Sequence, residues 1–145
     1  MTRFLLLTIA MITLASCGGS ERPAVEISDI KILAPLPGSH SGVAYMTIRN
    51  NGETPIVVES ARSPQFARVE MHRTVIENGV SKMRPLGSVT LPPGESVSFE
   101  QGGRHFMMMG AETETGPGSP VTIEISHTNG LLIVSATMQA RLPAE

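Results

Sequence analysis

Hydrophobic and polar residues alternate along most of this 145-residue chain, with a period of two residues rather than the 3.6 of a helix. The alternation is clearest where Val121, Ile123 and Ile125 are interleaved with threonine, glutamate and serine. Successive side chains of a β-strand point to opposite faces, so such segments predict strands with one buried face. Similar segments lie at 25–32, 43–49, 56–59, 88–91, 97–99 and 132–138.

Glycine and proline punctuate these segments. The 14 glycines and 11 prolines argue against long helices and predict turns at places such as Pro92-Pro93-Gly94 and Gln101-Gly102-Gly103. An apolar content of 41% is enough for one domain with a sizeable core, and no internal repeat is visible. The predicted fold is all-β: an antiparallel Greek-key β-sandwich, cupredoxin-like or immunoglobulin-like, over residues 24–140, with 141–145 as a C-terminal tail.

Asn78-Gly79 is the strongest hairpin signal in the chain, because both residues tolerate the positive φ angles of a two-residue turn. If Glu77 and Val80 flank the turn as a pair, Thr74 lies opposite Met83. His72 is two residues from Thr74 and shares its face. His72 and Met83 are then diagonal neighbours, with Cβ atoms roughly 7–8 Å apart.

A second pair of the same residue types lies at His105 and Met107. At strand spacing these two side chains share one face, whereas Phe106 and Met108 point the other way, toward the core. Imidazole and thioether are neutral donors, and the softness of thioether favours Cu(I) over zinc, magnesium or calcium. A site without thiolate also suits an oxidising compartment.

Each of these residues also has an ordinary interpretation. His72 alternates with polar residues and fits an exposed strand face, while Met83 and Met107 fit irregular gaps in a core. Met109 shares a face with Met107 and is a possible outer ligand. The remaining candidates are expected to be structural: Met71 and Met108 in the core, and His40 and His127 in solvated turns.

The spacing of the four residues carries a resemblance. His72, Met83, His105 and Met107 reproduce the H-x10-M-x21-H-x-M pattern of the periplasmic PCuAC-type copper chaperones. The chain also resembles that family at 42–52, at 69–72 and at the turn 92–94, and departs from it in Arg104 and Phe106 and in having no tryptophan. The resemblance implies a Cu(I) site formed by these four side chains and delivery of copper to cytochrome c oxidase or another copper acceptor.

The N-terminus is predicted to be a targeting segment. Arg3 precedes an apolar run at 4–14, which is too short to span a bilayer, and 14–17 (Leu-Ala-Ser-Cys) resembles the lipobox of bacterial lipoprotein signals. Residues 1–16 are then the signal peptide, Cys17 carries the lipid, and 17–23 form a tether. The expected location is periplasmic or otherwise extracytoplasmic, on a membrane; the alternative is an ordinary secretory signal with a chance cysteine.

Composition excludes several classes of function. Cys17 is the one cysteine of the sequence, so the domain has no disulfide framework, no cysteine nucleophile and no thiolate for a blue-copper centre. The net charge of -2 and the 3% aromatic content give no basis for binding nucleic acid. No catalytic constellation is visible, so the protein is not expected to be an enzyme.

The expected function is therefore a Cu(I) metallochaperone. Two alternatives stay open at this point. One keeps the metal but assigns the protein to copper buffering or tolerance at the cell envelope. The other is a structural or adaptor lipoprotein without metal.

Overall fold

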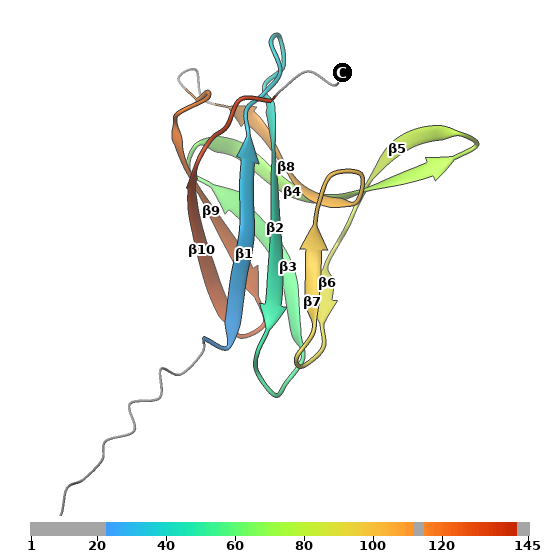
Figure 1. Ribbon diagram of the computed structural model, residues 1–145, viewed down its shortest axis with the longest axis vertical. Coiled ribbons are helices and arrows are strands. Elements are labelled where there is room, and N and C mark those ends of the chain that lie inside the picture. Colours follow the sequence, from blue (N-terminus) through green and yellow to red (C-terminus); the bar gives the residue numbers. More distant parts are fainter. Residues whose placement is uncertain (1–22, 112–114, 142–145) are drawn as a thin grey trace, which may run out of the picture.

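The computed structural model describes residues 23–111 and 115–141 (Figure 1). The predicted signal peptide, Cys17, the start of the tether and the tail beyond residue 141 lie outside the described residues. The described part of the chain forms ten β-strands: β1 (Val25–Leu33), β2 (Ser41–Asn50), β3 (Ile56–Ser63), β4 (Phe66–Glu77), β5 (Val80–Pro85), β6 (Val89–Leu91), β7 (Ser96–Phe99), β8 (Arg104–Ala111), β9 (Pro120–His127) and β10 (Gly130–Thr137).

The strands pair in the order β1-β2-β8-β4-β3-β9-β10, with β5 on β4, β6 on β3 and β7 on β2. Every pairing between these strands is antiparallel. A parallel bridge between Leu33 and Gln139 ties the end of β1 to the segment after β10, so the sheet nearly closes on itself. The predicted all-β antiparallel sandwich is confirmed.

The alternation seen in the sequence fixes the core. Val121, Ile123 and Ile125 of β9 are fully buried, and the polar residues between them are not. Phe106 of β8 stacks on Phe99 of β7 with ring centroids 4.3 Å apart. The core therefore lies between the two layers of the folded sheet.

β3 extends beyond the predicted segment 56–59, through the polar residues up to Ser63. The hydrophobic pattern does not predict this extension. Its strand conformation is maintained instead by hydrogen bonds to the two neighbouring strands. Ala61 pairs with Val69 of β4 on one side and with Ile125 of β9 on the other. Tertiary pairing thus overrides weak local strand signal.

The hairpin of β4 and β5 projects from the body as an arm (Figure 1). Its register is the predicted one, with Glu77 opposite Val80 and Thr74 opposite Met83. Asn78 and Gly79 have φ angles of 54° and 76°, as a two-residue turn of this kind requires. Every residue of β5 is exposed, so the arm carries Met83 into solvent at the edge of the body.

Residues 23–111 and 115–141 contain no helix that is long and apolar enough to cross a membrane.

Candidate metal centre

Strands β4 and β8 bring the two predicted histidine–methionine pairs onto one face of the sheet. His72 lies directly opposite His105, and Glu70 lies directly opposite Met107. Paired residues of antiparallel strands share a face, so His72, His105 and Met107 project from the same surface. Met83 joins that surface because it pairs with Thr74, two residues from His72 on β4.

One open cavity on this face is lined by three of the four predicted ligands, Met83, His105 and Met107. Thr74 and the turn residues Gln101 and Gly102 also line it. His72 is not among the lining residues. Its ring instead packs edge-on against that of His105, with centroids 5.9 Å apart and an angle of 62° between the planes.

His105 is 5% exposed, although it lies on the face of β8 opposite the core. Its Nδ1 lies 3.2 Å from the carbonyl oxygen of Gly103. Burial is the main cause that lowers the pKa of His105 below the ordinary 6.5. The bond to Gly103 opposes this shift, and the electrostatic effects of the neighbouring His72 and Arg141 add to it. A neutral imidazole with a free ring nitrogen is the form that a metal requires.

His72 is held differently. Its side chain is 13% exposed, and its Nε2 lies 2.9 Å from Oε2 of Glu70. Its Nδ1 is buried and is the one buried side-chain nitrogen or oxygen, within the described part of the chain, that has no hydrogen-bond partner. A buried polar atom without a hydrogen-bond partner reduces the stability of the folded state, and a ligand bound to this nitrogen would offset that cost.

Glu70 occupies the position between a cation and the histidine. Its Oε1 forms an ion pair with Nε of Arg68 at 3.0 Å. The bond to His72, followed by the charge of Arg68, lowers the pKa of Glu70 below 4.5, while partial burial opposes the shift. Arg68 also lies 3.6 Å, through Nη2, from the sulfur of Met109, which lies outside the four predicted ligands.

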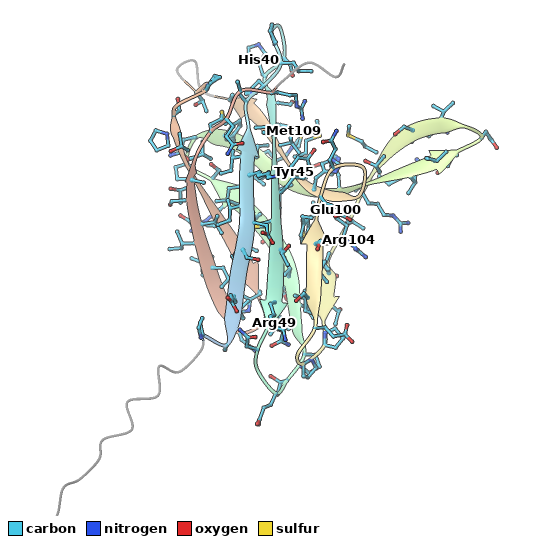
Figure 2. The ribbon with its side chains drawn as sticks, viewed as in Figure 1. His40, Tyr45, Arg49, Glu100, Arg104 and Met109 are labelled. Atoms are coloured by element: carbon cyan, nitrogen blue, oxygen red, sulfur yellow. The ribbon has the colours of Figure 1, made fainter. Side chains whose placement is uncertain are left out.

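The other predicted assignments can be compared with the structure residue by residue. Met71 and Met108 are buried in the core, as predicted. His40 is exposed in the loop before β2, at the upper end of the body (Figure 2). His127 ends β9 and is half-buried, and its Nδ1 accepts a hydrogen bond from the backbone of Asn129. Neither of these histidines lines the cavity.

Sequence reasoning missed three residues of this face. Glu70 lies two residues before His72 on β4 and shares its strand face, so the spacing in the sequence could have predicted a contact between the two side chains. Tyr45 and Arg141 line both this cavity and a larger groove over β1, β2 and β7. Tyr45 lies on β2 near the level at which the arm leaves the body (Figure 2). Arg141 comes from beyond β10, so no local pattern connects it with the site.

The set of four predicted ligands matches the preference of a soft metal ion better than that of a hard one. It contains two imidazoles and two thioethers, and none of these groups is an oxygen donor. The described residues, 23–111 and 115–141, contain no group of three or more His, Cys, Asp or Glu side chains that could hold a metal ion. The partnerless Nδ1 of His72 supplies an independent structural reason for a ligand on this face.

The model of the family described as "Putative lipoprotein LpqE-like" matches residues 25–135. The chain is 26% identical over 117 residues to "Putative lipoprotein Lxx21020" of Leifsonia xyli subsp. xyli, covering 80% of this chain and 69% of the relative.

Two solved structures share the fold. The copper-bound PCuAC domain from PmoF2 superposes with a TM-score of 0.67 at 20% identity, over 81% of this chain and 94% of that domain. The solution structure of CuI-DR1885 from Deinococcus radiodurans gives a TM-score of 0.65 at 26% identity, over 85% of this chain and 83% of that protein. The chain therefore belongs to the LpqE-like lipoprotein family and has the fold of the PCuAC copper-chaperone domains.

Proposed function

We propose that this protein is an extracytoplasmic metallochaperone that binds Cu(I) through His72, Met83, His105 and Met107. The observation that carries the proposal is the register of β4, β5 and β8, which puts all four side chains on one face. The copper-bound state of the PmoF2 domain and the Cu(I) state of DR1885 support copper as the cargo.

The arrangement suits a carrier. Imidazole and thioether are neutral, so an acceptor can displace them one at a time without separating charges. Met83 is 60% exposed on the arm, whereas His105 is buried. An incoming protein can therefore compete with Met83 first while the histidines still hold the ion.

We further propose that the carrier is a lipoprotein anchored through Cys17, acting at the periplasmic or outer face of a membrane. The lipobox-like segment 14–17 and the lipoprotein relative support the anchor. Cytochrome c oxidase is the acceptor that we propose, because its copper centres lie in an exported domain.

Copper titration tests the site. The chain from residue 18 onward, which lacks the Cys17 thiol that would itself bind Cu(I), is titrated with Cu(I) under reducing conditions, alongside His72→Ala and Met107→Ala, with His40→Ala as the matched control. The unaltered protein and the control should bind one equivalent, and each ligand variant should lose at least about tenfold in affinity, since one charge-neutral donor is removed. Unchanged stoichiometry and affinity in both ligand variants would exclude the site.

A cellular measurement separates delivery from buffering. Cells that lack the protein should lose oxidase activity at low copper and regain it when copper is added. Normal oxidase activity together with increased copper sensitivity would favour envelope buffering instead. No effect on either property, with no binding in vitro, would favour a structural or adaptor lipoprotein.

A further inference from the structure

Glu70 is the charged side chain in direct contact with a proposed copper ligand, and it lies outside the proposed ligand set. It reaches His72 from two positions earlier on the same strand face. An ionised carboxylate has no proton to donate, so the short contact of 2.9 Å requires that His72 donate through Nε2.

This requirement determines which ring nitrogen of His72 carries the proton. A neutral imidazole carries one proton, so a proton on Nε2 leaves Nδ1 with a free lone pair. The other neutral form would place two lone pairs against each other at Nε2 and leave a buried N–H at Nδ1 without an acceptor. A doubly protonated ring would also leave that buried N–H without an acceptor.

His105 has the opposite arrangement. Its Nδ1 lies 3.2 Å from the carbonyl oxygen of Gly103, which can only accept. The proton of neutral His105 is therefore on Nδ1, and Nε2 is free. The two paired histidines are held as different tautomers by two different acceptors.

We propose that Glu70 is a positioning residue that fixes His72 as the Nε2–H tautomer and so makes Nδ1 the copper-binding atom of that ring. This inference rests on the proposed copper-binding function. It extends the site to Arg68, whose Nε lies 3.0 Å from Oε1 of Glu70 and whose positive charge attracts that side of the carboxylate. Carboxylates that accept from a ligating histidine commonly fix ring orientation in this way.

Glutamine at position 70 gives the sharpest test. Arg68 can only donate, so it should take the carbonyl oxygen of the new amide and leave the NH2 group pointing at Nε2 of His72. The amide would then donate to Nε2 and drive the proton of the ring to Nδ1. Glu70→Gln should therefore invert the tautomer, whereas Glu70→Ala should leave a mixture.

The tautomers are read from long-range ¹H–¹⁵N correlations of the histidine rings in the copper-free chain from residue 18 onward, at pH 8. Unaltered protein should show Nε2–H at His72 and Nδ1–H at His105. Glu70→Gln should move the proton of His72 alone, and Glu59→Ala, an exposed strand carboxylate, should move neither. Cu(I) affinity, measured against a chromophoric chelator, should fall by roughly 10–100-fold in Glu70→Gln and Glu70→Ala.

The two measurements fail separately. An Nδ1–H tautomer at His72 in the unaltered protein, or a ring unaffected by both substitutions, would overturn the positioning role. Absence of Cu(I) binding by the unaltered protein would overturn the proposed function and with it the copper-binding part of this inference. If Glu70→Ala fails to fold, as seen from its amide spectrum, the near-isosteric Glu70→Gln decides the question.

Discussion

Burial of His105 has a consequence for stability as well as for binding. Its folded-state pKa lies below the ordinary 6.5, because burial disfavours the charged ring. Between the two values the unfolded chain binds more protons than the folded one, so stability should fall as the pH drops below about 6.5. Chemical denaturation of the copper-free protein between pH 7.5 and 5 measures this loss.

His105→Asn removes the titrating group and keeps an amide nitrogen at the position of the ring Nδ1 that contacts Gly103. The variant should lose part of the acid sensitivity, although its stability at pH 7.5 will also change. Identical pH profiles for the variant and the unaltered protein would contradict the assignment to His105.

A methionine of the site and a methionine of the core differ in their exposure to oxidants. Met83 is 60% exposed, and Met108 of the core is fully buried. Mild peroxide should therefore oxidise Met83 before Met108, and the sulfoxide is a poor soft ligand. We expect Cu(I) affinity to fall in step with oxidation of Met83, as followed by peptide mass spectrometry. Retention of full affinity after complete oxidation of Met83 and Met107 would remove both sulfurs from the proposed site.

Individual residues were predictable from the sequence where strand periodicity governs them. The shared face of His105 and Met107 and the core positions of Phe106 and Met108 follow from alternation alone. The hydrogen bond between His72 and Glu70 depends on side-chain rotamers, which alternation does not specify. The burial of His105 could not be predicted from the sequence either, because it depends on which residues pack over the outer face of β8.

The β4–β5 arm is the element whose geometry the sequence specified best. Asn78-Gly79 fixes the turn, and the turn fixes the register that places Met83 beside Thr74. The neighbouring pairing of β4 with β8 has no turn to define it, since the two strands are far apart in sequence. The sequence did not predict the pairing of β4 with β8; the four proposed ligands could meet only if these strands lay side by side.

Gly79→Ala tests how the arm contributes to the site. Gly79 has a φ of 76°, and a Cβ there would meet no atom within 4 Å, so the cost is purely conformational. A left-handed conformation costs a non-glycine residue about 1–2 kcal/mol, and the arm should loosen by about that amount. Backbone amide exchange should increase in β5, and Cu(I) affinity should fall because Met83 is less well placed.

Gly87→Ala is the matched control for this change. Gly87 also has open space around its Cβ position, and its φ is not in the positive region. It should leave both the exchange in β5 and the copper affinity unchanged. Equal behaviour of the two variants would show that the arm does not determine the position of Met83.

At the level of the whole molecule, the sequence predicted the class of fold but not the strand order. Alternation and turn residues identify strands, yet they do not say that β8 lies between β2 and β4. The closure between Leu33 and Gln139 depends on backbone atoms, which carry no residue-specific signal. Such long-range pairing arises from the collective packing of the core rather than from any local pattern.

β8 links the core to the candidate metal site, because one of its faces packs in the core and the other lines the site. Met108 is fully buried, whereas its neighbour Met107 is half-buried and lines the cavity. Truncation of a buried methionine leaves a cavity and typically costs about 2–5 kcal/mol, whereas a side chain at an open cavity loses less packing. Met108→Ala should therefore reduce the free energy of unfolding far more than Met107→Ala.

Copper binding should show the opposite order. Met107→Ala removes a proposed ligand from a fold that stays intact, so its Cu(I) affinity should fall although its denaturation midpoint changes little. Met108→Ala should bind Cu(I) nearly normally under conditions where it is still folded, because its side chain points away from the ligands. Denaturant unfolding and chelator competition on the same two variants measure both quantities. If the two variants lose stability and affinity in parallel, the two faces of β8 are not independent, and folding and copper binding depend on the same contacts.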